Sequence, residues 1–203
     1  MQITLTNTGK RFNREWIFRG FNYEFVTPKK YAITGSNGSG KSTLLQVISG
    51  SLTHSEGAIQ FANNHDVTEA EHHFKYVSIA APYLELIEEM TANEFLAFHT
   101  QFKPLNIAAE EALQITNLSN AANKQIRYYS SGMKQRLKLA QAFFSNTPVL
   151  LLDEPTTNLD REGVELYLHL INNYTANKLV IISSNVTEEY QFCDEVISIK
   201  NYK

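Results

Sequence analysis

The chain has 203 residues, of which 43% are hydrophobic and 19% charged, so it can form a buried core and carries too little charge for a disordered protein. Its formal net charge of −3 disfavours a dedicated nucleic-acid binder, because such proteins usually carry an excess of basic residues. A single cysteine excludes an intramolecular disulfide, and no apolar run approaches the roughly 20 residues of a membrane-spanning helix. We therefore expect a soluble protein of the cytosol.

The first sixty residues favour β-structure. Alternating, β-branched and aromatic residues between turn signals predict strands over Ile3–Thr6, Ile17–Val26 and Ala58–Phe61. A short apolar strand over Tyr31–Thr34 leads directly into a glycine-rich loop. After that loop, Leu44–Ile48 begins a helix that Gly50 can end.

The middle of the chain is expected to be helical. Apolar residues recur at helical spacing over Thr91–Phe102 and Ile107–Thr116, and Pro104 separates the two segments. We interpret this part as a helical subdomain that covers approximately residues 84–145. The chain shows no internal repeat, low-complexity tract or linker, so we predict a single domain over residues 1–203.

Helices and buried strands alternate in the last third of the chain. The pattern predicts helices over 133–144 and 162–173, and fully apolar strands over 149–152, 179–182 and 196–199. Such an alternation implies a parallel sheet that helices cover on both faces. The sequence therefore predicts a protein of the α/β class.

A phosphate-binding loop follows the strand over Tyr31–Thr34. It fits the pattern G-x-x-x-x-G-K-[ST] and, with the next threonine, consists of Gly35, Ser36, Asn37, Gly38, Ser39, Gly40, Lys41, Ser42 and Thr43. Glycines allow successive N–H groups to point at phosphate oxygens, and the following helix adds the positive end of its dipole. Lys41 can contact the β- and γ-phosphates of ATP, and the Ser42 hydroxyl can bind Mg²⁺. The position between a strand and a helix favours this interpretation over a glycine-rich turn with an incidental lysine.

Two acidic residues follow the apolar strand over 149–152. A carboxylate at the C-terminal end of a parallel strand lies beside the phosphate loop, where Asp153 can hold Mg²⁺ through its water shell. Glu154 is then placed to orient and deprotonate the water that attacks the γ-phosphate. Many strand ends carry an acid, so this prediction depends on the phosphate loop beside it.

The segment Tyr129–Arg136 resembles the signature motif of ABC ATPases, which is usually written LSGGQ. It precedes Asp153 and Glu154 by the usual distance, and Pro155–Asp160 resembles the D-loop that follows in this family. The resemblance spans essentially the whole chain. It implies a P-loop NTPase core, in which a mostly parallel sheet is flanked by helices, together with an N-terminal antiparallel β-subdomain and a helical subdomain.

The resemblance also implies that two subunits share each ATP. In the family, the signature faces the γ-phosphate bound by a second copy, so Ser130, Ser131 and Gly132 would act in trans within a homodimer or heterodimer. These residues begin a helix, whose N-terminal N–H groups favour an anion. Ser131 stands where glycine is common and Met133 where glutamine is common, and the small serine leaves room for a phosphate.

Phe12 lies where the family places an aromatic residue that stacks on the adenine ring. Two alternatives stay open, because Phe12 could instead pack within the β-subdomain and Trp16 could be the stacking residue. The chain has 12 phenylalanines and 10 tyrosines, so a single aromatic residue is weak support.

The chain departs from the family at two positions. The family's Q-loop glutamine is missing, because the matching stretch is Tyr76–Tyr83 and no glutamine occurs between Gln60 and Gln101. A water or a main-chain carbonyl could complete the metal shell instead. Asn185 stands where most members place a histidine that contacts the γ-phosphate, and an asparagine retains a donor but cannot become cationic. We therefore predict normal ATP binding and slow hydrolysis in the absence of a partner.

The resemblance favours the ATP-binding and ATP-hydrolysing subunit of a transporter. The membrane permease would be a separate chain, and this chain would be cytoplasmic and peripheral to the membrane. The segment Tyr83–Met90 mixes apolar residues with three acids and falls where the family docks the permease, and a solvated acidic helix end is the alternative interpretation. A soluble ABC ATPase that acts on DNA or ribosomes is the alternative, and a regulatory module without catalysis is a third reading that Glu154 disfavours.

Overall fold

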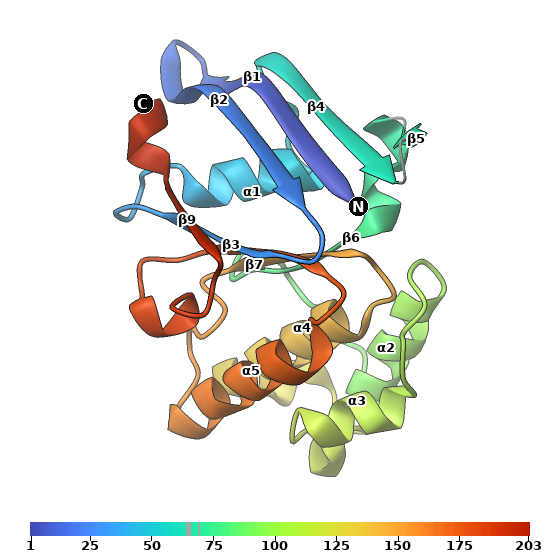
Figure 1. Cartoon of the computed structure of the whole chain (residues 1–203). Helices are drawn as coiled ribbons and strands as arrows, with labels where there is room; N and C mark the ends of the chain where they lie inside the picture. The colour runs from blue at the N-terminus through green and yellow to red at the C-terminus, as the bar shows by residue number, and fades with distance from the viewer. Residues whose placement is uncertain (64–65, 69) are drawn as a thin grey trace. The chain divides into compact units, whose positions relative to one another are not determined.

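The computed structural model describes residues 1–63, 66–68 and 70–203, with side chains described outside 64–71. The chain forms two compact units (Figure 1). The first, which we call the sheet unit, comprises Met1–Ile79, Pro148–Glu154 and Asn177–Lys203. The second, which we call the helical unit, comprises Ala80–Thr147 and Pro155–Ala176.

An antiparallel sheet with the strand order β2-β1-β4-β5 lies in the sheet unit. Its strands are β1 (Gln2–Phe12), β2 (Glu15–Val26), β4 (Glu56–Asn63) and β5 (Asp66–Thr68). The first two form a hairpin that pairs Phe12 with Glu15. The sequence predicted three of these strands at the right places, whereas β5 was not predicted.

A second sheet has the strand order β6-β7-β8-β3-β9. Its strands are β3 (Lys30–Thr34), β6 (Val77–Ala80), β7 (Val149–Asp153), β8 (Leu179–Ser183) and β9 (Glu195–Ser198). The pairs β7–β8, β8–β3 and β3–β9 are parallel. Every residue of β7 and β8 is buried, as their unbroken apolar sequences predicted.

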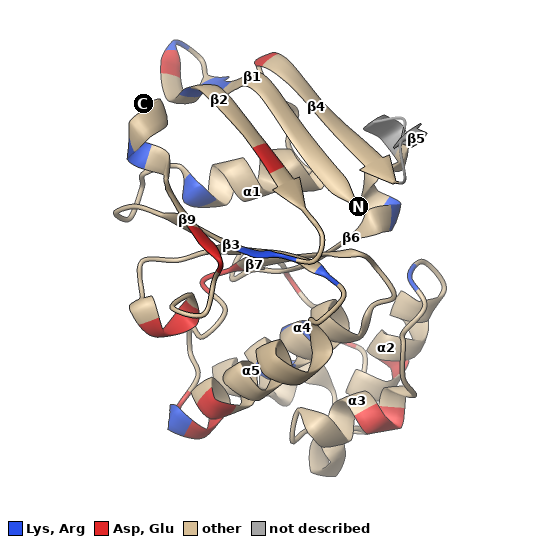
Figure 2. Cartoon of the chain, in the orientation of Figure 1, with Lys and Arg blue, Asp and Glu red and all other residues tan. Residues whose placement is uncertain are grey.

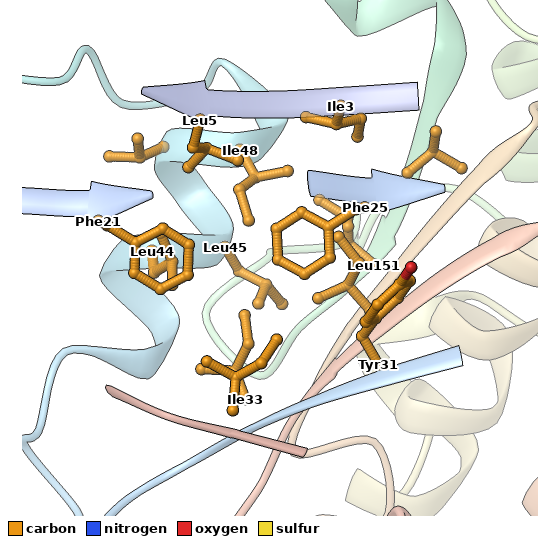
Figure 3. Close-up of a cluster of buried hydrophobic side chains, with 14 of the residues drawn as sticks. Ile3, Leu5, Phe21, Phe25, Tyr31, Ile33, Leu44, Leu45, Ile48 and Leu151 are labelled. Carbon is orange, nitrogen blue, oxygen red and sulfur yellow. The ribbon is translucent and has the colours of Figure 1, made fainter. Parts of the chain in front are cut away.

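Helix α1 (Lys41–Ser49) packs between these two sheets and ends at Gly50, which has a left-handed φ of 78°. Figure 3 shows the core that forms there. It joins apolar side chains of β1, β2, β3, α1 and β7, among them Ile3, Leu5, Phe21, Phe25, Tyr31, Ile33, Leu44, Leu45, Ile48 and Leu151. This core fixes the N-terminus of α1 beside the C-terminal ends of β3 and β7.

The helical unit is built from α2 (Ala92–Thr100), α3 (Ala109–Ile115), α4 (Ser131–Phe144) and α5 (Arg161–Tyr174). Helices α2, α3 and α5 all pack against α4. Short 3-10 helices cover Ala70–Tyr76, Ser119–Ala121, Ile126–Tyr128, Thr187–Glu189 and Ile199–Tyr202. The predicted helices are confirmed, and no helix in the described part of the chain is long and apolar enough to cross a membrane.

Candidate functional site

The glycine-rich loop joins β3 to the N-terminus of α1 (Figure 1). Gly40, which precedes the helix, has a φ of 103°, a conformation that L side chains rarely adopt. A Cβ atom at Gly40 would lie 2.6 Å from Cγ2 of Ile17, so a side chain there would also clash. The Ser39 N–H donates to the Ser36 carbonyl at 3.0 Å and closes a tight turn within the loop.

The loop forms a cavity of about 210 Å³. The cavity is lined by Ile17, Asn37, Gly38, Ser39, Gly40, Lys41, Ser42, Thr43 and Glu154. Lys41 is 4% exposed, and its Nζ atom donates to the carbonyls of Gly35 at 3.1 Å and Ser36 at 3.5 Å. A buried ammonium group with neutral partners, beside the N-terminus of a helix, makes this cavity suited to an anion.

Three buried oxygen atoms around the loop have no hydrogen-bond partner among the described residues. They are Oδ1 of Asp153, Oγ of Ser39 and Oγ of Ser183. Burial raises the pKa of Asp153, while the hydroxyl of Ser42 and the charge of Lys41 oppose that rise. A carboxylate oxygen and nearby hydroxyls are the ligands that Mg²⁺ prefers, so these residues fit the metal that the phosphate loop implies.

Glu154 follows β7 and borders the cavity. Its backbone is left-handed with a φ of 43°, which is uncommon for a residue other than glycine and costs on the order of 1 kcal/mol. Its N–H donates to the carbonyl of Ser183 at 2.8 Å, so β8 holds the residue in this conformation. A strained residue at the wall of a polar cavity supports the prediction that Glu154 is functional.

Asn185 lies two residues beyond β8. Its Nδ2 atom donates to Oδ1 of Asn37 in the phosphate loop at 2.9 Å, across 148 positions of sequence. The structure thus brings this residue to the loop, and its contact with a γ-phosphate stays a prediction. The hydrogen bond to Asn37 was not predicted, because no local pattern connects the two residues.

Phe12 ends β1, and the residue is 48% exposed. The Lys10 Nζ atom lies 5.0 Å from the centre of this ring. The Trp16 ring, in contrast, carries the guanidinium groups of both Arg11 at 5.4 Å and Arg19 at 4.7 Å. The more open ring of Phe12 favours it over Trp16 as a stacking surface, although Phe12 does not line the cavity.

The signature residues lie in the helical unit, at the start of α4. Ser130 caps the helix by accepting a hydrogen bond from the Met133 N–H at 3.2 Å, which leaves its own hydroxyl hydrogen to donate elsewhere. The buried Gln135 side chain donates to the carbonyl of Pro155 at 2.8 Å. The signature helix and the D-loop are therefore joined within one unit, with Ser130 and Ser131 exposed.

The stretch that lacks the Q-loop glutamine contributes to a separate groove in the helical unit. The Lys138 Nζ atom donates to the carbonyls of Ala81 at 3.3 Å and Pro82 at 3.0 Å. The groove has a volume of about 320 Å³ and is lined by Pro82, Leu84, Glu85, Leu86, Glu88, Lys134 and Lys138. Part of the predicted permease segment thus borders a cavity with both acidic and basic walls.

The family described as ABC transporter matches residues 18–157, which is more than half of the chain. The chain therefore belongs to the family of ABC transporter ATP-binding proteins.

Two relatives illustrate this membership. An uncharacterized ABC transporter ATP-binding protein, YxlF of Bacillus subtilis, is 34% identical over 84% of this chain and 58% of its own length. The Nod factor export ATP-binding protein I of Burkholderia lata is 30% identical over 98% of this chain and 67% of its own length. The chain thus spans between about a half and two thirds of these two relatives.

Solved structures confirm the P-loop NTPase fold of the ABC type. The ATP-binding subunit of an ABC transporter superposes with a TM-score of 0.85 at 21% identity, over 98% of this chain and 85% of that one. A dimeric ATP-binding cassette bound to ADP and phosphate gives 0.83 at 23% identity, over 97% of this chain and 93% of that one. At these identities the likeness establishes the fold.

Sequence reasoning missed two contributors to the site. Ile17 lines the cavity from β2, and its apolar side chain carried no sign of this in the sequence. Ser183 contributes an unpartnered buried hydroxyl, and its carbonyl anchors Glu154. The polar pair Ser183–Ser184 at the end of an otherwise apolar strand was the available signal, since polar groups at that edge of a parallel sheet face the site.

Proposed function

We propose that this chain binds ATP with Mg²⁺ and hydrolyses it as one subunit of a transporter whose membrane permease is a separate chain. One observation carries the proposal. Within one compact unit, the anion-binding cavity is bordered by Glu154, and the buried Asp153 beside it has an oxygen without a partner. Such a cavity meets the needs of a triphosphate, a divalent cation and an activated water.

Each residue of the site has a definite task in this proposal. The N–H groups of the loop and Lys41 bind the phosphates, and Phe12 stacks on adenine. Ser42 and Asp153 would hold Mg²⁺, which neutralises phosphate charge when it is bound. Glu154 orients the attacking water and takes its proton.

A second ABC domain would complete the site. We propose that Ser130, Ser131 and Gly132 contact the γ-phosphate held by another copy or a related chain, so that ATP drives closure of a dimer. Ser130 is exposed and retains a hydroxyl hydrogen for an acceptor, which supports this role. The whole chain would then act as a single ABC domain, with the helical subdomain approximately at residues 84–145.

The proposed location is the cytoplasmic face of a membrane. The groove beside Leu84, Glu85 and Glu88 supports docking of a short permease segment there. Figure 2 shows basic and acidic residues in both units, and the net charge of −3 gives no reason to propose a nucleic-acid partner. We also propose that hydrolysis is slow until the permease is bound, because the Q-loop glutamine is missing and Asn185 replaces a histidine.

The Glu154→Gln variant tests this function. Glutamine preserves the shape of the side chain but cannot accept a proton, so we expect ATP affinity to be unchanged and hydrolysis to fall about 100- to 10,000-fold. Fluorescent-nucleotide titration measures the affinity, a phosphate-release assay measures hydrolysis, and light scattering measures an ATP-stabilised dimer of the variant.

Two further variants serve as controls. Lys41→Ala removes the cation from the cavity and should weaken ATP binding about 10- to 100-fold. Glu24→Gln makes the same chemical change at an exposed position of β2 and should alter neither quantity. Wild-type hydrolysis in Glu154→Gln would refute the proposed role of Glu154. Rapid turnover of the isolated wild type that Asn185→His leaves unchanged would refute the dependence on a partner.

A further inference from the structure

We propose that Asn185 is a positioning residue that holds the tip of the phosphate loop through Asn37, in addition to any contact with nucleotide. The inference rests on the proposed function, since it concerns the same phosphate site. Its basis is the hydrogen bond from Asn185 Nδ2 to Asn37 Oδ1 at 2.9 Å. Among the described residues, this is the only side-chain hydrogen bond that reaches residues 36–39 from outside residues 35–43.

Asn185 is itself held in place by the end of β8. The N–H of Ser184 donates to the carbonyl of Ile33 at 3.1 Å, which ties the segment to the last residues of β3. The Ser184 hydroxyl oxygen accepts a hydrogen bond from the Val186 N–H at 2.9 Å and forms a turn around Asn185. The donor therefore projects from a backbone that is fixed on both sides.

The tip of the loop, in contrast, has few constraints of its own. Asn37 is exposed, and Gly38 has a φ of 72° with no atom within 4 Å of where its Cβ would lie. A loop with a glycine at its tip loses much conformational freedom when a bound phosphate orders it. A hydrogen bond that restricts the tip in advance reduces this cost and so increases affinity.

The chemistry of a carboxamide suits this task. The Nδ2 atom of Asn185 carries two hydrogens, and only one is used by Asn37, so the other can still meet a phosphate oxygen. Restraint of the loop affects the N–H groups that bind all the phosphates of the nucleotide. It should therefore favour ADP and ATP alike, whereas a contact with the γ-phosphate can favour only ATP.

The test is a double-mutant cycle on Asn37→Ala and Asn185→Ala, with the dissociation constants of ADP and ATP, KM and kcat as readouts. A neutral, exposed hydrogen bond contributes a factor of about 2 to 10. We expect Asn185→Ala to weaken the binding of ADP and ATP by this same factor and to raise KM accordingly, while kcat reports separately on any contact with the γ-phosphate. In the Asn37→Ala background, Asn185→Ala should cause a smaller loss of affinity than it causes in the wild type.

A conservative variant and a matched control complete the design. Asn185→His retains an N–H donor of similar reach and should restore affinity, but only when Asn37 is present. Asn93 and Asn123 form the same kind of exposed bond, Nδ2 to Oδ1 at 2.8 Å, in the helical unit. Asn93→Ala should leave nucleotide affinity unchanged. This result would show that loss of an exposed hydrogen bond between two asparagines does not weaken nucleotide binding unless the bond reaches the phosphate loop.

The outcomes separate this inference from the proposed function. If the wild type binds neither nucleotide, the proposed function fails and the inference fails with it. If the wild type binds both, and the losses of the two single variants simply multiply, the inference alone is wrong. A fall in kcat of tenfold or more with unchanged ADP affinity would also overturn it, since Asn185 would then act directly on the γ-phosphate.

Discussion

His99 and Asp153 are both polar and largely buried, but only the histidine has its hydrogen bonds satisfied. The His99 Nδ1 atom accepts from the Gln141 side chain at 3.2 Å, and Nε2 lies 2.8 Å from the Ser145 hydroxyl, which donates onward to the Gln141 carbonyl at 2.6 Å. This chain of bonds requires a neutral imidazole with its hydrogen on Nε2. Burial and the charge of Lys103 lower the pKa of His99 to about 4.

This network makes the stability of the protein dependent on pH. A histidine in the unfolded chain has a pKa of about 6.5. Between pH 6.5 and 4, His99 is therefore protonated in the unfolded chain and neutral in the folded chain. The contribution of neutral His99 to the free energy of unfolding is thus complete above pH 6.5 and is lost as the pH falls toward 4. We expect the free energy of unfolding to fall by about 1 to 2 kcal/mol in this range, after allowance for the partial exposure of the ring.

Urea denaturation at several pH values measures this effect. The His99→Gln variant cannot bind the proton and should lose that part of the pH dependence. His169→Gln, at an exposed position of α5, should retain it. Identical pH profiles for the wild type and His99→Gln would show that the network does not control the protonation of His99.

The residues of the site differ in how far the sequence could predict them. The loop from Gly35 to Thr43 is contiguous, and its function depends on local backbone geometry, so its pattern could be recognised directly. The bond between Asn37 and Asn185 depends on the register of two parallel strands that are far apart in the chain. No local periodicity encodes such a register, and this bond therefore required the structure.

At the scale of elements, α2 and α3 differ in how their N-termini are capped. In α2, the Thr91 hydroxyl accepts from the Glu94 N–H at 3.2 Å, and the Glu94 carboxylate accepts from the Thr91 N–H at 2.8 Å. In α3 the corresponding position is Ala108, whose side chain makes no capping bond. The first N–H groups of α2 thus have partners that those of α3 lack.

Opposite substitutions at these two positions should have opposite effects. We expect Thr91→Ala to lower the free energy of unfolding by about 1 kcal/mol, and Ala108→Ser to raise it by about 0.5 to 1 kcal/mol. Thermal or urea denaturation measures both. Thr91→Ser keeps the hydroxyl and serves as the control, and an equal loss in Thr91→Ser and Thr91→Ala would contradict the assignment of the cap.

The strands show the same division between local and distant determinants. Strands β7 and β8 were predicted because their unbroken apolar sequences reflect burial of every residue. Strand β6 was not predicted, since Val77–Ala80 is only four residues long and its pattern is too short to distinguish a strand from a loop. Short strands at a sheet edge depend on the neighbouring strand for their conformation, so propensity alone identifies them poorly.

For the molecule as a whole, the proposed permease surface carries acids that are already paired. Glu88 forms an ion pair with Lys134, and Glu89 lies 3.4 Å from Arg127. We expect the double variant Glu88→Lys, Glu89→Lys to abolish co-purification with the permease, because like charges replace complementary ones across the interface. Pull-down from detergent-solubilised membranes, with identification of any multi-spanning protein that co-purifies, measures the effect.

A charge swap separates docking from internal structure. Exchange of Glu88→Lys with Lys134→Glu preserves the internal ion pair and reverses its orientation at the groove. If the acids serve docking, the swapped variant should remain defective, whereas Glu110→Lys on α3 should behave as the wild type. Restoration of co-purification by the swap would mean that Glu88 supports only the fold of this segment.

The left-handed backbone of Glu154 has a consequence for how this chain can change over evolutionary time. Glycine or asparagine would adopt a φ of 43° more readily than glutamate, so either substitution would relieve strain at the end of β7. A more stable variant is thus available at this position, at the expense of the proposed base. Glutamate at this position thus carries a cost in stability, which a trade-off between stability and the proposed role in hydrolysis would explain.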